Sequence, residues 1–479
     1  MKKILLYVFL LLIGISSCTD KILDEIDTNP NRVNDAPLKT LLPQVEVSLV
    51  TRVFGSDAAI GTFYATEQNT FVLGGNALQG GGFGGSIWTN AYLIINDLNI
   101  IKQKSVEVEA WTYAGVADVL KAFNLSALVD MFGDIPYSQA FKSEFVNPAF
   151  DSSESIYPEI QKILDEAIVN LEKTSGSIAP TNDDMFFNGN KGLWIKTAYG
   201  LKARLYNRMS NVDPQGSANN ALTALSKSFA TDAENFTFTK FANTIQNDNP
   251  ISGTHIDQPG SCIGNGIYNI MASYSPTGNV EDDPRAKIWF TRVGGKIIAA
   301  PNGKALPDFG EPRLDGAKYS KPEIFKWRTA PMPILTFIEL KFIEAEAQFR
   351  LNKKAEANTA YETAVSLALK HASNFNPAVA LTAVQMDAYK ALPKVFPGTS
   401  SLTLKDIISQ KYIFFYQFQS VETYNDIRRT ELIPVTDPTG RPNRSIYPNS
   451  EKDRNTSTPA NIDQYSVFEA STKLFWAKK

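Results

Sequence analysis

The stretch MPILTFIELKFIEAEAQFRLNKKAEANTAYETAVSLALK, residues 332–370, decides how the rest of the chain is interpreted. In each half, apolar residues recur at steps of three and four, which places them on one face of an α-helix. The first set is Leu335, Ile338, Phe342, Ala345 and Phe349, and the second is Ala357, Tyr361, Ala364 and Ala368. Residues 351–354 form a short turn between them. The stretch therefore predicts a helical hairpin.

Small and bulky residues are placed along the two predicted helices in a way that allows close packing. Ala345 and Ala357 let the helices approach, and Phe349 and Tyr361 fill the space beside them. This placement resembles half of the tetratricopeptide pattern. Because a single hairpin leaves one face uncovered, the pattern predicts further hairpins stacked against it. The alternative is an ordinary antiparallel helix pair within an α-helical domain.

The composition is typical of a folded protein that does not bind nucleic acid. Hydrophobic residues make up 43% of the 479 residues, which is enough for a large core. The chain has 47 basic and 50 acidic residues, and the sequence contains no basic run and no basic domain. The charge pattern that nucleic-acid-binding proteins require is therefore absent from the sequence.

The N-terminus has the features of a secretory leader. Two lysines precede twelve largely apolar residues, 4–15, which are too few to span a bilayer, since that takes about 20. The leader ends in Ile15-Ser16-Ser17-Cys18, which resembles a bacterial lipobox. Residues 1–17 are therefore predicted to be a lipoprotein signal peptide, with Cys18 as the lipidated first residue of the mature chain. A plain signal peptide is the alternative.

The few cysteines and histidines leave little room for metal or redox chemistry. A lipidated Cys18 cannot pair with Cys262, so no intramolecular disulfide is expected. With only His255 and His371, a histidine-based zinc site is not expected either. Residues 80–85 have the form G-x-G-x-x-G, but no β-α-β pattern surrounds them. Neither a metal nor any other cofactor is predicted.

Helical periodicity predicts a mainly α-helical protein whose helices fall in three regions. These regions are residues about 41–210, 332–370 and 402–430. Periodicity is lost at about 211–331 and 371–401, where residues typical of turns are frequent. Residues 18–479 are therefore expected to form one domain, in which tetratricopeptide-like hairpins build an α-superhelix with long loop-rich insertions. Long loops in a compact fold often carry function.

Several peptides along the chain resemble the SusD/RagB family, specifically its SusD-like branch. They occur in the family's order at residues 132–137, 156–171, 283–285, 342–347, 410–411, 422–430 and 447–455. The strongest match is C-terminal and includes Arg428-Arg429-Thr430. Two positions depart from the family pattern: Tyr424 stands where tryptophan is common, and Glu431 stands where glycine is common.

The resemblance implies a nutrient-binding lipoprotein on the cell-surface side of the outer membrane. Such a protein caps a SusC-like TonB-dependent transporter and helps to deliver an oligosaccharide or peptide to it. The family is not catalytic, so no catalytic residue is predicted. The matching peptides are expected to be structural. Glu422, Arg428 and Arg429 in particular are expected to form an ion-paired cluster that locks the last helix. A ligand clamp is the alternative for these three residues.

Candidate ligand contacts follow from the chemistry of sugars. Sugars present apolar C–H faces ringed by hydroxyls, so their sites combine flat aromatic surfaces with amide or carboxylate groups. Aromatic residues near loops and outside the clear helical stripes are therefore predicted to contact the ligand: Phe83, Trp88, Tyr274, Trp289 and Trp327. The nearby polar residues are Asn76, Gln79 and Asn90. The alternative for each aromatic residue is packing within the core.

Two other functions fit parts of the sequence. A surface-anchored glycoside hydrolase needs two carboxylates about 5 Å or about 6.5–9.5 Å apart, and sequence spacing does not exclude such a pair. Enzymes of that kind are usually built on barrels or sandwiches, whereas this chain is predicted to be helical. A scaffold that binds only a transporter, without a ligand site of its own, is the other alternative.

Overall fold

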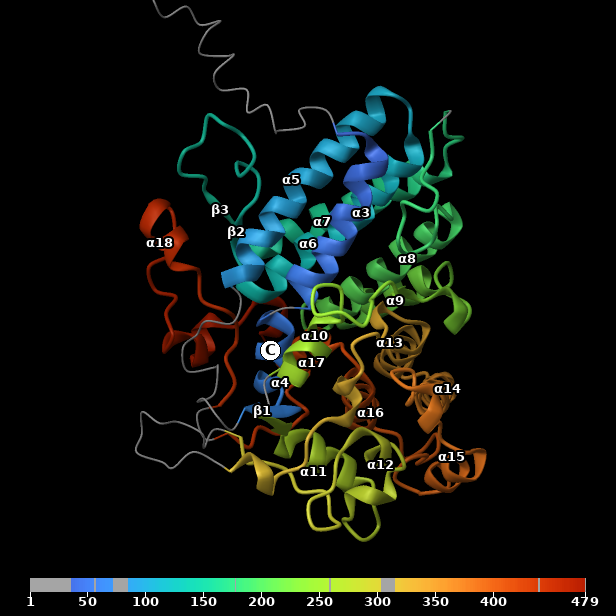
Figure 1. Ribbon diagram of the computed structural model, residues 1–479. Helices are drawn as coiled ribbons and strands as arrows, with labels where there is room; N and C mark the ends of the chain where they lie inside the picture. The colour runs from blue at the N-terminus through green and yellow to red at the C-terminus, as the bar shows by residue number, and fades with distance from the viewer. Residues whose placement is uncertain are drawn as a thin grey trace, which may run out of the picture.

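The computed structural model describes residues 36–55, 57–71, 85–176, 178–257, 260–302, 315–437 and 440–478. The predicted leader, Cys18 and Phe83 lie outside this part of the chain. The described chain is mainly helical (Figure 1). Its α-helices of eight or more residues are α3 (Leu38–Ser48), α4 (Asp57–Ala65), α5 (Gly85–Glu107), α6 (Trp111–Phe132), α7 (Ser153–Glu172), α8 (Lys191–Arg208), α9 (Pro214–Leu225), α10 (Pro250–Asp257), α11 (Asn265–Ser273), α13 (Phe337–Arg350), α14 (Lys354–Lys370), α15 (Ala383–Lys390), α16 (Leu404–Phe415) and α17 (Ser420–Thr430).

Consecutive helices pack against one another as the hairpin pattern predicts. Helix α5 packs on α6, α6 on α7, α7 on α8, α8 on α9, and α13 on α14 (Figure 1). Helix α6 lies at the centre of the first group, and nearly all of its side chains are buried. A Cβ atom on Gly115 would lie 2.5 Å from Leu171, so glycine allows α6 to approach α7 closely. The predicted mainly α-helical, tetratricopeptide-like architecture is confirmed.

The stretch 332–370 forms the predicted hairpin, with one correction at its start. Residues Met332–Leu335, predicted to be helical, form strand β6, which pairs antiparallel with β4 (Phe236–Phe238). The helix begins only after Thr336, whose hydroxyl accepts a hydrogen bond from the Glu339 amide at 3.1 Å. The residues of β6 are largely buried, like those of the helix that follows. The apolar spacing of the helix therefore extends back into the strand and places the predicted start of the helix too early.

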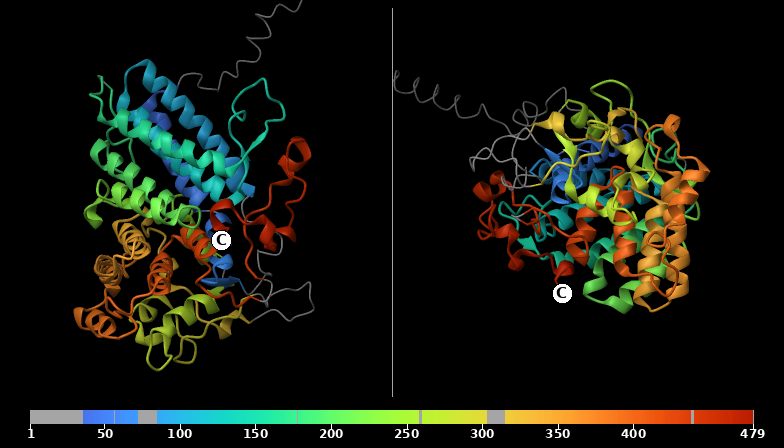
Figure 2. Two further views of the ribbon diagram at one scale, coloured as in Figure 1. Left: turned by 180° about the vertical axis from the view of Figure 1, so that it is seen from behind. Right: turned by 90° about the horizontal axis from the view of Figure 1, so that it is seen from below.

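Short strands connect the loop-rich segments to the helical body. Strand β1 (Asn69–Phe71) pairs with β5 (Ser261–Ile263), and β2 (Ile135–Pro136) pairs with β3 (Phe150–Asp151), both antiparallel. The β2–β3 loop projects from the end of α6 and lies beside the C-terminal segment in both views of the molecule (Figures 1 and 2).

The regions predicted to be irregular contain helices that the periodicity did not reveal. Residues 211–331 include α9, α10, α11 and the short α12 (Ala286–Trp289), and residues 371–401 include α15. The fully buried side chains of helix α9 are all small, namely Ser217, Ala218, Ala221 and Ala224. A stripe of small residues packs as closely as a stripe of large ones, but it does not stand out in a pattern of large apolar residues.

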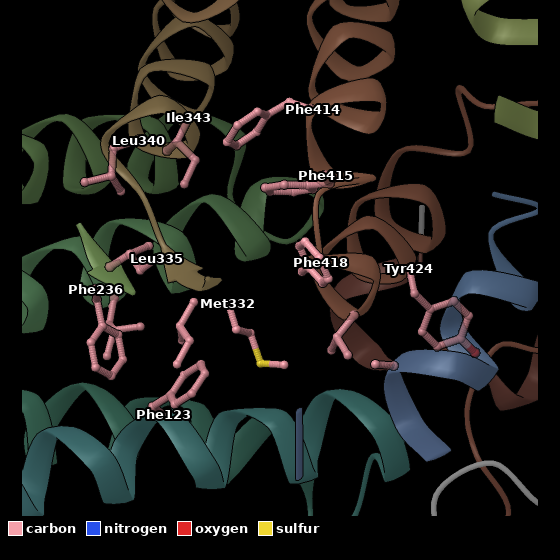
Figure 3. Packing of buried hydrophobic residues seen from close by; sticks show 14 of the residues in the cluster. Phe123, Phe236, Met332, Leu335, Leu340, Ile343, Phe414, Phe415, Phe418 and Tyr424 are labelled. Atoms are coloured by element: carbon pink, nitrogen blue, oxygen red, sulfur yellow. The ribbon is translucent and has the colours of Figure 1, made fainter. Parts of the chain in front are cut away.

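The core is a continuous cluster of apolar side chains. It joins the helices that pack around α6 to the hairpin α13–α14 and to α16 and α17. Figure 3 shows side chains from α6, β4, β6, α13, α16 and α17 pointing toward one another. Phe123 of α6 lies edge-to-face against Phe236 of β4, with ring centroids 6.0 Å apart. Strand β4 thus connects the first helical group to the hairpin α13–α14, since its partner β6 leads directly into α13.

A buried set of ion pairs crosses this core and holds α17 in place. Arg204 donates to both carboxylate oxygens of Glu339 at 2.6 Å, and Arg208 donates to Glu422 at 2.6 Å. Arg429 donates to Glu346 at 2.9 Å and to Asp426 at 2.9 Å. We call these seven residues the ion-paired core; they are Arg204, Arg208, Glu339, Glu346, Glu422, Asp426 and Arg429. Glu422 and Arg429 are thus ion-paired as predicted, but each pairs with residues outside the predicted trio and they do not pair with each other.

Arg428 departs from that prediction. Its guanidinium donates to the carbonyl oxygens of Asp130 and Asn443, each at 2.7 Å, and to the side-chain oxygen of Asn425 at 2.5 Å. All of these acceptors are neutral.

Candidate functional site

A groove of about 460 Å³ opens where the start of α5, the β2–β3 loop and α18 (Asn449–Arg454) meet. Figures 1 and 2 show the β2–β3 loop and α18 side by side at this edge of the molecule. The volume is within the range typical of small-molecule sites. We call it the aromatic groove, and its lining is Trp88, Thr89, Tyr92, Leu93, Asn96, Pro136, Ala140, Phe141, Pro148, Ser450, Glu451 and Arg454.

Aromatic rings form one wall of the aromatic groove. The Trp88 and Tyr92 ring centroids are 5.2 Å apart, and those of Tyr92 and Phe141 are 6.0 Å apart. Trp88 and Tyr92 are four residues apart on α5 and therefore share one face of that helix. Phe141 is 38% exposed and Trp88 only 5%, so Phe141 and the half-buried Tyr92 offer more ring surface than Trp88 does.

The wall is fixed from behind by further aromatic side chains. Trp88 lies edge-to-face against Phe132 at 5.0 Å and against Tyr447 at 5.7 Å between ring centroids. Tyr92 donates its hydroxyl to the Pro136 carbonyl oxygen at 2.6 Å. Burial raises the pKa of Tyr92 well above its ordinary value, so this hydroxyl remains a donor. The aromatic wall is therefore preorganised.

Polar side chains also line the aromatic groove. Glu451 and Arg454 are contributed by α18, and Thr89 and Asn96 lie exposed on α5. Glu451 accepts a hydrogen bond from the Asn455 amide at 2.8 Å, which orients its carboxylate. An apolar wall together with amide, hydroxyl and charged groups in one groove is an arrangement that suits a sugar ring and its hydroxyls.

The other predicted ligand residues do not line the aromatic groove. Trp289 is fully buried and donates its indole N–H to the Ala372 carbonyl oxygen at 2.7 Å. Tyr274 is also buried, and its hydroxyl donates to the Asp406 carbonyl oxygen at 3.3 Å. Trp327 is 41% exposed but lies elsewhere on the surface. The structure thus keeps Trp88 at a groove and places Trp289 and Tyr274 within the core.

The predicted polar partners contribute little within the described chain. Asn90 uses its amide within α5, where it donates to the Ser86 carbonyl oxygen at 2.8 Å. Asn76 and Gln79, like Phe83, lie outside the described residues.

Sequence reasoning missed Tyr92 and Phe141 as ligand candidates. The spacing of Tyr92 four residues after Trp88 could have identified Tyr92 as its neighbour on α5. Phe141 gives no comparable signal, because a loop residue has no periodicity and its proximity to Tyr92 depends on the β2–β3 pairing. Glu451 and Arg454 come from a segment more than 300 residues away in sequence, so only the fold brings them to this site.

A larger cavity, of about 730 Å³, lies at the other end of α5. It is lined by the end of α5, the start of α3 and residues 178–183, and the only aromatic side chain among the described residues lining it is Tyr113. The hydroxyl of Tyr113 donates to Asp183 at 2.5 Å. We favour the smaller aromatic groove as the ligand site, because a sugar needs stacked ring surface more than volume.

The described residues provide no arrangement typical of a metal centre, and the lining of the aromatic groove provides none typical of a glycosidase. Within this part of the chain, no group of three His, Cys, Asp or Glu side chains is placed to hold a metal ion. Among the described residues that line the aromatic groove, Glu451 is the only carboxylate. Glycoside hydrolysis ordinarily uses two carboxylates that flank the bond. The aromatic groove is therefore suited to binding.

Fold and groove together define a class: a protein of stacked helical hairpins with a preorganised aromatic groove at one edge. The family model described as "starch-binding associating with outer membrane" (SusD-like) matches residues 30–450. The chain therefore belongs to the SusD-like family, a family of glycan-binding proteins associated with the outer membrane. The family resemblance of the sequence is thus confirmed.

Solved structures agree with this assignment. A SusD/RagB family protein from Bacteroides thetaiotaomicron is 25% identical, with a TM-score of 0.81, and the match covers 92% of this chain and 99% of that one. A chitin-binding SusD homologue from Flavobacterium johnsoniae is 18% identical, with a TM-score of 0.71, and the match covers 91% and 98%. A SusD homologue from Bacteroides fragilis is 22% identical, with a TM-score of 0.72, and the match covers 93% and 100%.

Two further observations accompany these matches. A search of the curated proteins finds no match to the chain. Of the helices in the described part of the chain, none combines the length and the apolar character needed to cross a membrane.

Proposed function

We propose that this protein is a non-catalytic, lipid-anchored outer-membrane protein that binds an oligosaccharide in the aromatic groove and passes it to a SusC-like TonB-dependent transporter. The observation that carries the proposal is the wall formed by Trp88, Tyr92 and Phe141 in the same groove as Glu451 and Arg454. The rings stack on the apolar faces of a sugar, and the polar side chains bind its hydroxyls.

Family membership supports both the ligand class and the membrane association. The family description names starch, and one structural relative is described as chitin-binding. Both polymers consist of pyranose rings with flat C–H faces, so the same aromatic wall suits either. The lipobox-like sequence that ends in Cys18 supports anchoring through lipid. The proposed order of events is capture in the aromatic groove followed by transfer to the transporter.

Calorimetric titration with starch-derived and chitin-derived oligosaccharides tests the ligand site. Phe141→Ala is the most informative variant, because this partly exposed side chain can be truncated without opening the core. We expect binding to weaken about tenfold, which corresponds to about 1.4 kcal/mol, through loss of ring stacking. Trp327→Ala is the matched control, since it removes an exposed aromatic ring that does not line the aromatic groove.

Two results would contradict this proposal. If Phe141→Ala bound the oligosaccharides as tightly as the unmodified protein, the aromatic groove would not be the site. Release of reducing sugar from a bound glycan would identify a hydrolase instead.

Anchoring and transfer are tested in the native host. Cys18→Ala should move the protein out of the outer-membrane fraction, and the unmodified protein should co-purify with a barrel transporter from detergent extracts. Binding of a transporter without binding of any glycan or peptide would favour the pure scaffold.

A further inference from the structure

A second pocket, of about 310 Å³, opens beyond the end of α17. Two arginines line it: Arg428 from α17, and Arg441 from the segment that follows. The other lining residues are Ile427, Glu431, Ile433, Pro434, Val435, Pro442 and Asn443. We call it the arginine pocket. Neither arginine forms an ion pair with any described residue, whereas Arg204, Arg208, Arg285 and Arg429 all do.

Arg441 has unused hydrogen-bonding capacity. Its Nε donates to the Ala65 carbonyl oxygen at 2.8 Å, while its Nη2 is buried and has no acceptor among the described residues. Burial lowers the pKa of Arg441, and nearby Glu67 only partly opposes that shift. A buried guanidinium with an unsatisfied N–H is costly, and a carboxylate that accepts two parallel hydrogen bonds removes that cost.

Arg428 adds a second fixed positive charge. Its donors are bound to backbone carbonyls and an amide, so none of its partners neutralises it. Burial lowers its pKa as well. The guanidinium lies over the Tyr424 ring, 3.8 Å from the ring centroid, which keeps the charge in position.

A third arginine contributes to the same region. Burial raises the pKa of the Tyr424 hydroxyl, and Arg428, Arg441 and Arg444 all oppose that rise. Three guanidinium groups therefore lie near one hydroxyl, which itself donates to the Pro442 carbonyl oxygen at 2.6 Å. Arg444 has no ion pair within the described chain, and its Nη2 is buried without an acceptor there.

The neighbouring carboxylates are committed to other partners. Glu67 lies close enough to favour the charged form of Arg441, but its oxygens accept from the Thr436 amide and hydroxyl and from the Asp437 amide. Glu431, at the edge of the pocket, pairs with Lys473. The Nη2 group of Arg441 therefore still lacks an acceptor among the described residues, and a ligand carboxylate would supply one.

We propose that the arginine pocket binds an anionic sugar, and specifically the carboxylate-bearing ring of a uronic acid. The two arginines supply the charge for the carboxylate, and Arg441 supplies the donors. The pocket is too large for a simple inorganic ion alone. Its remaining lining includes apolar side chains such as Ile433 and Val435 and the amide of Asn443. The apolar side chains suit the C–H face of a sugar ring, and the amide suits its hydroxyls.

The identification of the ligand as a sugar rests on the proposed function. The identification of the ligand as an anion does not, because it follows from the two arginines alone. The same stretch of chain serves both sites, since residues 441–443 line the arginine pocket and residues 450–454 line the aromatic groove. Between them, the Arg444 guanidinium lies 4.7 Å from the centroid of the Tyr447 ring, and Tyr447 supports Trp88. A glycan that carries uronic acid residues is therefore the polymer class that suits both pockets.

Titration calorimetry with three small probes tests the proposal on the unmodified protein. Sodium glucuronate has both the sugar ring and the carboxylate. Glucose has only the neutral ring, and sodium acetate has only the carboxylate. We expect glucuronate to bind at least about tenfold more tightly than either of the others, and its affinity to fall as chloride is raised. Equal affinity for glucuronate and glucose overturns the proposal, and equal affinity for glucuronate and acetate overturns its sugar part.

Two variants of Arg441 locate the site. Arg441→Gln should weaken glucuronate binding about tenfold or more, and Arg441→Lys should retain part of it, because lysine keeps the charge and loses the fork. Arg292→Gln is the control, since Arg292 is an exposed arginine paired with Glu281 in a distant segment. If Arg441→Gln fails to fold, Arg441→Lys and the probe comparison on the unmodified protein still decide the question. Unchanged glucuronate binding in a folded Arg441 variant overturns the site.

The two proposals fail separately. Loss of neutral oligosaccharide binding in Phe141→Ala, with glucuronate binding retained, supports two distinct sites. If no neutral glycan binds while glucuronate does, the aromatic groove proposal fails and the arginine pocket stands.

Discussion

Two neighbouring arginines on α17 occupy opposite electrostatic environments. Arg429 belongs to the ion-paired core and faces Glu346 and Asp426, whereas Arg428 faces carbonyl oxygens and the ring of Tyr424. Both side chains are almost completely buried. Successive residues on a helix point in directions about 100° apart, so one helix presents each charge to a different part of the molecule.

This difference separates charges that stabilise the fold from charges that remain for a ligand. In the ion-paired core, each guanidinium meets carboxylates that return most of the desolvation cost. Glu346 illustrates this: burial would raise its pKa, yet Arg429, Arg350 and Lys411 together hold it well below its ordinary value. At the arginine pocket Glu67 raises the pKa of Arg441 less than burial lowers it, and no carboxylate within the described chain forms an ion pair with Arg441, which is why we propose a binding role there.

The largest expected effect comes from breaking the ion-paired core. Arg429→Met removes the partner of Glu346 and leaves a buried carboxylate without its main counter-charge. We expect the free energy of unfolding to fall by about 3–5 kcal/mol, measured by urea denaturation followed by circular dichroism.

The matched control for that prediction is an exposed ion pair. Lys326→Ala breaks the pair with Glu323 on the surface, and this should cost less than about 1 kcal/mol. A similar loss for both variants would show that the buried pairs are not a main contributor to stability.

His255 is a buried neutral side chain and so differs from the buried ions of the ion-paired core. The imidazole of His255 lies against Phe325, with its Nδ1 2.8 Å from the Ile251 carbonyl oxygen and its Nε2 3.1 Å from the Asn69 amide nitrogen. The backbone carbonyl requires Nδ1 to donate, so Nε2 accepts and the ring is neutral. Burial lowers the pKa of His255 from 6.5 to about 4.

The sign of the pH effect follows from that shift. Below about pH 6.5 the unfolded chain binds a proton at His255, and the folded chain does so only near pH 4. Stability from this residue is therefore complete above pH 6.5 and is lost as the pH falls to about 4, by about 3 kcal/mol in total.

A variant isolates His255 from other groups that titrate in the same range. Asp118, whose pKa burial raises to about 6, changes stability in the opposite direction between its ordinary 3.8 and 6. His255→Phe keeps the ring contacts and removes the proton site, so the difference in unfolding free energy between the two proteins should shrink as the pH falls from 7 to 4. A difference that stays constant with pH would contradict the assignment.

The sequence predicts the helical architecture well and the residues of the candidate ligand site only in part. The hairpin 332–370, the helices around Trp88 and the family assignment all rest on local patterns that a single sequence carries. Helix α9 escaped detection because its buried residues are small. Trp289 and Tyr274 were chosen because they lie outside clear stripes, but a residue in a short helix can be buried by distant segments.

The arginine pocket was not predictable for a different reason. The sequence predicts an ion pair for Arg428, because the guanidinium fork suits pairing with a carboxylate such as that of Glu422. Pairing depends on which side chains face each arginine, and these come from residues 130, 424 and 443, which no periodicity connects. Sequence composition counts charges, whereas only the fold shows which ones lack a partner.

The smallest expected effect, and the sharpest test of the comparison, is Arg428→Met. It removes a buried charge that has no carboxylate partner, so no uncompensated ion is left behind in the core. The cost is the loss of hydrogen bonds to the Asp130 and Asn443 carbonyl oxygens and of the contact with Tyr424, and we expect about 1–3 kcal/mol in the same urea experiment. Arg429→Met, one residue away with the same change in volume, is the control. If Arg428→Met were as destabilising as Arg429→Met, burial alone and not pairing would decide the contribution of these arginines, and the distinction between structural and ligand-binding charges would not hold.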